Sequence, residues 1–282
     1  MGFDLATIQF LTRWKDLGIS LDRVLTLGRQ WMYVKPEEVR SVLANNGIRI
    51  SLASVEELFA DKGYCEPLLK LLGANQIESM DVSAYENATI LQDLNQPWPA
   101  ELLGRYSLIV DGGTLEHVFH FPTALRSVMQ AIRTGGHFLS ITPANNLMGH
   151  GFYQFSPELF YRVFTAENGF AVEKMLLYEQ PWKSVWYEVA DPSVLRARVE
   201  LVNRNPAYLI VCAKKISSAG LSRIPVQSDY PLLYWQQSAG AETAKMKPPP
   251  SVSFFKRHAP EWLGHLYRRL RPFRAPYFIK AR

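Results

Sequence analysis

The stretch YSLIVDGGTLEHVFHF, residues 106–121, decides the fold class. Residues 107–110 form a short apolar run that ends in the sequence DGG at 111–113, a pattern typical of a buried parallel strand followed by a loop. Apolar residues at helical spacing follow over 121–132, a glycine pair ends them, and a second strand pattern occupies 137–142. These segments predict a βαβ unit, so polar residues of the loop are expected at the carboxyl edge of a sheet, where ligands bind.

The same stretch and the segments after it resemble class I S-adenosylmethionine (SAM)-dependent methyltransferases. The order YSLIVDGGTLEHV, RTGGHFLSITPAN and FSPELFYRVFTAENGF is similar to the second half of that family, from strand four to the turn after the next helix. The resemblance covers roughly residues 22–215. It implies an α/β, Rossmann-like class I methyltransferase fold, with a seven-stranded, mostly parallel sheet and helices on both faces. It also implies SAM as the cofactor.

Length and composition agree with one α/β domain and an appended segment. The chain has 282 residues, of which 48% are hydrophobic and 20% are charged, enough apolar side chains for a sizeable core. We expect a methyltransferase-like domain over 1–215, with a helical insertion at about 36–73, and a proline-containing, basic extension over 216–282. Two cysteines are too few for a disulfide framework, which favours a reducing compartment.

The charge is concentrated in the extension. From Lys245 onward there are ten lysines and arginines and a single acid, although the whole chain has a net charge of only +5. Trp262, Leu266 and Leu270 predict a basic amphipathic helix that lies on an anionic membrane surface, and a solvated extension explains the pattern equally well. We expect a cytoplasmic protein with peripheral membrane contact and no specific nucleic acid partner, because no signal peptide or membrane span is evident.

The first cofactor candidates follow the strand pattern at 22–28. The resemblance places Gly28 in the loop that approaches the methionine part of SAM, although LGRQW has one glycine where the family usually has two or three. Arg29 is predicted to bind the carboxylate of that methionine, and a solvated arginine is an equally good interpretation.

Three further cofactor contacts are implied by the resemblance. Asp81 follows a strand pattern at 76–80 and would bind the ribose hydroxyls. The alternative is a turn aspartate that, with Ser83, caps the next helix. Asp93 and Leu94 stand where the family contacts adenine, and Asp111 ends the central strand. An acid buried there needs a hydrogen-bonding partner or a function.

The acceptor site is expected in the loop GHGFYQF, which follows the strand at 137–142. His150 stands between two glycines and is the predicted general base, with Asp111 as second choice and Tyr153 beside them, and a purely structural loop is the alternative. Glu116 and His117 have two interpretations, a catalytic role and a helix start, and the helix start explains them at least as well. No third ligand lies near His117 and His120 in the sequence, so no metal site is expected.

These residues predict a SAM-dependent methyltransferase that acts on a small-molecule or glycan-type acceptor. The GHGFYQFSPELF and SMDVSAYENA segments resemble those of bacterial methyltransferase-like proteins, some associated with surface-polysaccharide pathways; secondary metabolism is a further setting. The alternative is a non-catalytic scaffold with the methyltransferase fold, which the reduced glycine loop favours. An NAD enzyme is disfavoured because LGRQWM is not a G-x-G-x-x-G fingerprint.

Overall fold

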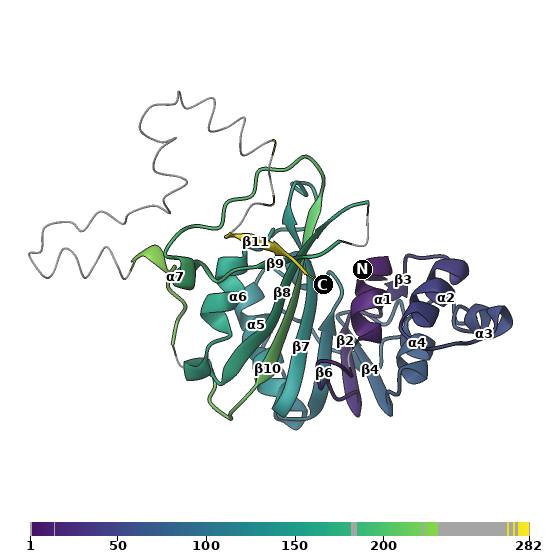
Figure 1. Cartoon of the computed structure of the whole chain (residues 1–282). Coiled ribbons are helices and arrows are strands. Elements are labelled where there is room, and N and C mark those ends of the chain that lie inside the picture. Colours follow the sequence, from purple (N-terminus) through teal and green to yellow (C-terminus); the bar gives the residue numbers. More distant parts are fainter. Residues whose placement is uncertain are drawn as a thin grey trace, which may run out of the picture.

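The fold is built on one large twisted sheet. The computed structural model describes residues 2–13, 15–181, 185–221, 223–230, 270, 273 and 276–281. Within these residues, nine strands form a sheet in the order β11-β9-β8-β10-β7-β6-β2-β4-β5, and β1 pairs with β3 separately (Figure 1). The strands are β1 (Gly2–Phe3), β2 (Arg23–Leu27), β3 (Trp31–Met32), β4 (Gln76–Asp81), β5 (Ile90–Leu91), β6 (Tyr106–Asp111), β7 (Ile132–Asn145), β8 (Phe170–Glu179), β9 (Tyr187–Val189), β10 (Ala207–Lys215) and β11 (Phe278–Lys280).

The order of the strands creates a switch point between β2 and β6. From β2 the chain runs outward through β4 to β5, and then returns to the other side of β2 for β6 and β7, all parallel. On the other side of β7 lies β10, which is antiparallel to both β7 and β8. The predicted fold class, a mostly parallel Rossmann-like α/β sheet, is confirmed, although the described sheet has nine strands rather than the predicted seven, because β9 and β11 extend it beyond β8. The carboxyl ends of its five parallel strands share one edge.

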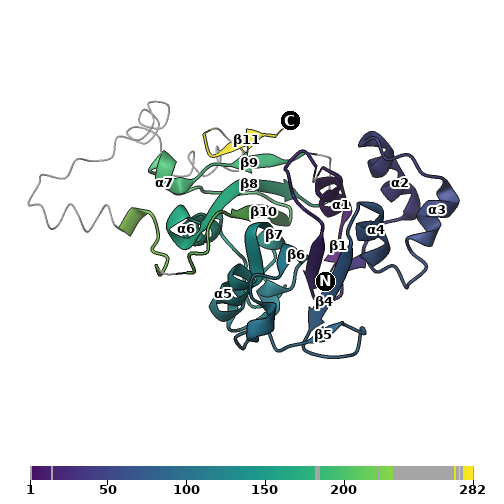
Figure 2. The same ribbon diagram turned by 90° about the horizontal axis from the view of Figure 1, so that it is seen from below.

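Helices cover both faces of the sheet (Figures 1 and 2). One face carries α1 (Leu5–Thr12), α2 (Pro36–Asn45) and α4 (Glu66–Leu71), with α3 (Leu52–Glu57) farther out. The other face carries α5 (Phe121–Ala131) and α6 (Pro157–Val163), while α7 (Pro192–Leu195) follows β9. Single 3-10 turns complete the set: η1 (Ala100–Leu102), η2 (Leu115–His117) and η3 (Ala166–Asn168).

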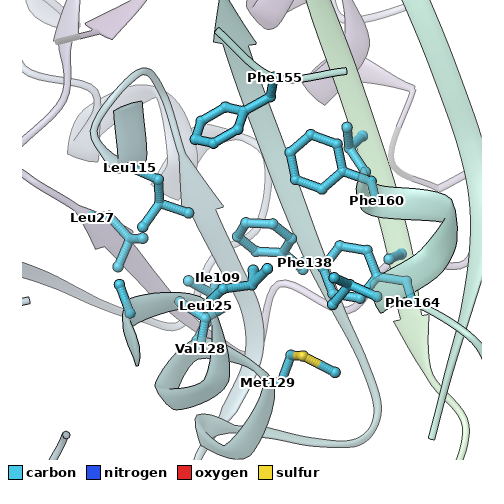
Figure 3. Close-up of a cluster of buried hydrophobic side chains, with 14 of the residues drawn as sticks. Leu27, Ile109, Leu115, Leu125, Val128, Met129, Phe138, Phe155, Phe160 and Phe164 are labelled. Carbon is cyan, nitrogen blue, oxygen red and sulfur yellow. The ribbon is translucent and has the colours of Figure 1, made fainter. Parts of the chain in front are cut away.

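The sheet separates two hydrophobic cores, because neighbouring residues of a strand point to opposite faces. In β6, Ile109 belongs to the core under α5 and α6, whereas Leu108 and Val110 belong to the core under α1, α2 and α4. Phe138 lies in the middle of the first core (Figure 3). Its ring is fully buried and lies 5.6 Å from the ring of Phe164, which follows α6. This packing fixes β7, and with it the loop that leaves its carboxyl end.

Several local predictions need correction. The amphipathic segment 54–72 is two short helices rather than one, because Lys62 and Gly63 both have positive φ between them. The extension also does not simply leave the domain at 216, because β11 pairs with β9 at the end of the sheet. The predicted helix around Trp262 and Leu266 lies outside the described residues. Within the described ranges, no helix is both long and apolar enough to cross a membrane.

His137 supplies a pH-dependent element of this core. Its side chain is fully buried in β7, with Nε2 3.1 Å from Oε2 of Glu173, and Lys214 lies 3.8 Å from the same carboxylate. Burial lowers the pKa of His137, opposed by Glu173. The unfolded chain therefore binds a proton more readily than the folded one. The free energy of unfolding is highest above the pKa of histidine in the unfolded chain, about 6.5, and decreases as the pH falls below that value.

We therefore expect the free energy of unfolding to fall between pH 7 and pH 5 through this side chain, because the unfolded chain takes up the proton before the folded one does. The His137→Gln variant keeps a donor for Glu173 without titrating. Urea unfolding at both pH values should show a smaller pH dependence for the variant. An identical dependence in both proteins would contradict the assignment.

Candidate active site

The loop after β2 is filled by protein side chains. Gly28 has a positive φ of 71° and its N–H donates to the carbonyl of Met80 at 2.7 Å. The fully buried side chain of Gln30 donates to the carbonyl oxygen of Leu27 and lies 3.3 Å from the hydroxyl of Thr114. The loop is thus packed against the β6–η2 connection, and Oε1 of Gln30 is buried without a hydrogen-bond partner among the described residues.

Arg29 does not have the free guanidinium that a cofactor carboxylate needs. It forms ion pairs with Asp61 and, at 2.7 Å, with Glu66, and it donates to the carbonyl of Glu86 at 3.2 Å. Its guanidinium also lies 3.9 Å from the centre of the Tyr64 ring. Binding of the methionine carboxylate by Arg29 stays a prediction, and these ion pairs do not favour it, because two acids of the helical insertion already neutralise the guanidinium.

Asp111 organises the loop rather than facing a substrate. It is fully buried, and Oδ1 accepts hydrogen bonds from the backbone N–H groups of Thr114 and Leu115 at 2.8 and 3.2 Å. Its Oδ2 accepts from the hydroxyl of Ser140 at 2.7 Å. Burial raises the pKa of Asp111, and these hydrogen bonds oppose the rise. We correct its predicted role as base and cofactor contact to that of a positioning residue, because both oxygens are used and neither reaches solvent.

Glu116 is the residue that sequence reasoning left aside. It belongs to η2 and its side chain has no solvent exposure, yet neither carboxylate oxygen has a hydrogen-bond partner within the described residues. Burial, followed by the neighbouring charge of Asp111, raises the pKa of Glu116 to about 8. A carboxylate held in this way is unusual outside functional sites, because burying an unpaired polar group costs several kcal/mol.

His150 is brought to Glu116 by the loop after β7. Its Nε2 lies 3.4 Å from Oε1 of Glu116, and its ring centre is 5.1 Å from that of His117. Desolvation and the neighbouring His150 lower the pKa of His117. The structure therefore joins the predicted His150 with two residues for which the sequence left both a helix start and a catalytic role open.

The backbone of the 149–153 loop is fastened to η2. The N–H groups of Phe152 and Tyr153 both donate to the carbonyl of Glu116, at 2.7 and 3.2 Å. Gly151 has a φ of +74°, and a Cβ at this position would lie 2.8 Å from the same carbonyl oxygen. The hydroxyl of Tyr153 donates to the carbonyl of Phe119 at 2.7 Å, so this hydroxyl anchors the loop, and its predicted catalytic role stays a prediction.

The remaining predicted contacts lie at the ends of β4 and β5. Oδ1 of Asp81 accepts from the N–H of Ser83 at 3.0 Å, the turn that the sequence offered as the alternative. Oδ1 of Asp93 accepts from the N–H and the side-chain amide of Asn95, which lowers the pKa of Asp93, and Leu94 is buried in the core. In both aspartates, Oδ2 has no hydrogen-bond partner within the described residues, so one oxygen of each remains for a ligand.

These donors and acceptors suit part of SAM. The free oxygens of Asp81 and Asp93 fit ribose hydroxyls and an adenine amino group, which are hydrogen-bond donors. The methionine end fits less well, because Arg29 is occupied and Gln30 fills the loop after Gly28. A groove of about 370 Å³ lies elsewhere, between α6, the start of α7 and residues 198–199 and 225–227, and contains none of the predicted site residues.

Comparison with known proteins finds similarity among solved structures alone, at low sequence identity. No protein-family model matches the chain, and no curated protein matches it in sequence. Among solved structures, it is similar to the 1,6-didemethyltoxoflavin-N1-methyltransferase of Burkholderia thailandensis with bound S-adenosylhomocysteine (12% identity, 76% of this chain and 78% of that chain, TM-score 0.42). It is also similar to a SAM-dependent methyltransferase of Mesorhizobium loti (15% identity, 72% of this chain and 97% of that chain, TM-score 0.38). A third similar structure is the cyclase SpnF (11% identity, 73% of this chain and 80% of that chain, TM-score 0.41).

Proposed function

We propose that the protein is a SAM-dependent methyltransferase that acts on a small-molecule acceptor. The observation that supports this best is the division of the carboxyl edge into two halves. Asp81 and Asp93, at the ends of β4 and β5, suit the donor, while the buried Glu116 and the neighbouring His150 suit an acceptor. SAM supplies an electrophilic methyl group, so the protein has to align the two molecules and exclude water.

The surroundings of His150 favour an acceptor with an apolar part. Phe119 and Phe152 are largely exposed, their ring centres lie 5.8 Å apart, and both belong to the segments that carry the cluster. Exposed aromatic rings beside polar groups are common in binding sites for small molecules. A glycan-type acceptor, a cytoplasmic location and contact of the basic tail with anionic membranes remain predictions from the sequence.

Asp81 tests the donor half. The ribose contact predicts that Asp81→Ala weakens SAM binding by about 1.5–3 kcal/mol, the range for hydrogen bonds to a charged group, or about 10- to 150-fold. Asp81→Asn is the matched variant, because its amide oxygen can still accept the hydrogen bond from Ser83 but carries no charge. Calorimetry with SAM, together with thermal unfolding, measures both properties.

If Asp81 only caps the turn, Asp81→Asn should bind SAM normally and Asp81→Ala should lose stability instead. That pattern would remove Asp81 from the donor site. If both variants bind SAM equally weakly and keep the unfolding temperature of the unmutated protein, the carboxylate of Asp81 contacts SAM.

The second candidate function is a binding protein of the same fold without catalysis. The neutralised Arg29 favours it, because the loop after β2 then offers no cationic side chain to the methionine carboxylate. Calorimetry of the intact protein with SAM and with S-adenosylhomocysteine separates the two candidates. Absence of binding to both compounds would favour the scaffold.

A further inference from the structure

We propose that Glu116, His117 and His150 form a binding site for one divalent transition-metal ion. The two histidines and the glutamate each offer one ligand atom, and all three atoms lie within 4.8 Å of one another. This revises the expectation of no metal site. The third ligand, His150, is distant in the sequence and reaches η2 only because the loop after β7 folds back onto it. The inference does not depend on methyl transfer.

The spacing of the ligand atoms fits an ion between them. Two ligands about 2.1 Å from a tetrahedral metal ion are separated by about 3.4 Å. Nε2 of His150 and Oε1 of Glu116 are 3.4 Å apart, and they make no hydrogen bond with each other. His117 is exposed, so its ring has space to turn toward the same point.

The buried carboxylate is an independent indication of a ligand. Both oxygens of Glu116 lack a hydrogen-bond partner within the described residues, although the side chain is entirely shielded from solvent. An unpaired buried carboxylate destabilises a fold unless something compensates it. A cation bound to it would satisfy the carboxylate where the described part of the protein does not.

The surrounding backbone holds the ligands in place before an ion arrives. Gly113 has a φ of +89°, and a Cβ there would lie 3.1 Å from Oε1 of Glu116. Gly151 approaches the backbone of Glu116 closely, and two hydrogen bonds join the 149–153 loop to that residue. These close approaches fix the relative position of η2 and the loop, as a metal site with ligands from two segments requires.

The donor set selects the type of ion. Imidazole and carboxylate ligands suit Zn²⁺, Mn²⁺, Fe²⁺ and Co²⁺, whereas Mg²⁺ and Ca²⁺ prefer sites made of oxygen atoms. Three protein ligands leave at least one coordination position open, which is the arrangement of catalytic rather than structural zinc. Both histidines are exposed, so this position is accessible from solution. A ligand with a hydroxyl or carboxylate oxygen suits it, and assigning that ligand to the methyl acceptor rests on the proposed function.

The test is metal binding by the full chain without an affinity tag. After chelator treatment and dialysis, we expect one equivalent of Co²⁺ to produce a visible absorption band, and Zn²⁺ to displace it and raise the unfolding temperature. His150→Ala and Glu116→Gln should each weaken Zn²⁺ binding by at least about 100-fold, because each removes a direct ligand. Mg²⁺ at the same concentration should have little effect.

His120→Ala is the matched control. His120 is an exposed histidine on the same segment and lies outside the cluster, so its loss should leave the Co²⁺ band and Zn²⁺ affinity unchanged. Binding that persists in His150→Ala and Glu116→Gln, or a stoichiometry of zero, would overturn the proposal. SAM calorimetry on the same samples keeps the two claims separate, because a failed metal site leaves SAM binding intact.

Discussion

Replacing His150 with alanine is expected to reduce turnover of the true acceptor by about 10²- to 10⁴-fold, the usual contribution of a positioned base. SAM affinity should stay the same, because the proposed donor contacts, Asp81 and Asp93, lie at the ends of β4 and β5 while His150 lies beyond β7. If His150 binds a metal ion instead of acting as a base, its replacement should also reduce turnover. Radiolabelled methyl transfer and calorimetry on one preparation measure both quantities.

The structure also predicts that the variant folds. His150 is about half exposed, with 45% of its side-chain surface accessible, so its removal leaves no cavity in either core. The His120→Ala variant again serves as the control and should turn over normally. If His150→Ala matches the unmutated protein in rate, the 149–153 loop has a structural role only and the acceptor site lies elsewhere.

The parts of the fold that the sequence predicted are those set by local patterns. The strand and helix of 106–132 were found almost to the residue, because their apolar spacing and the following glycines are local signals. The pairing of β11 with β9 was missed, because it joins segments far apart in the sequence. The split between α3 and α4 depends on a turn with two consecutive positive φ values, one of them at Lys62, which no sequence pattern predicts well.

The site was predicted in part for the same reason. His150 was chosen as a candidate because glycines flank it, a local feature, and its role stays a prediction. The ion pairs of Arg29 were not predicted, because Asp61 and Glu66 belong to the helical insertion and a single sequence does not reveal such pairs. Glu116 was left aside because a glutamate at the start of a helical turn is usually solvated. The available signal was Gly113, whose missing side chain makes room for the carboxylate.

Gly151→Ala is the second change with a large expected effect, since this residue connects fold and chemistry. The positive φ alone costs an alanine about 1–2 kcal/mol. In addition, the new methyl group would lie 2.8 Å from the carbonyl oxygen of Glu116, and a backbone atom fixed by two hydrogen bonds does not move easily. We expect a loss of about 2–4 kcal/mol in stability, or a displaced loop that separates His150 from Glu116.

Either result should reduce turnover and Zn²⁺ binding together. The molecules of the variant that remain folded should bind SAM with unchanged affinity. Gly149→Ala is the matched control: it lies two residues away in the same loop, and a Cβ there would have no neighbour within 4 Å. Chemical unfolding, Zn²⁺ titration and turnover should therefore be nearly unchanged for Gly149→Ala. If Gly151→Ala is equally neutral in all three measurements, the loop is not held against η2 in the way described, and His150 and Glu116 need not act together.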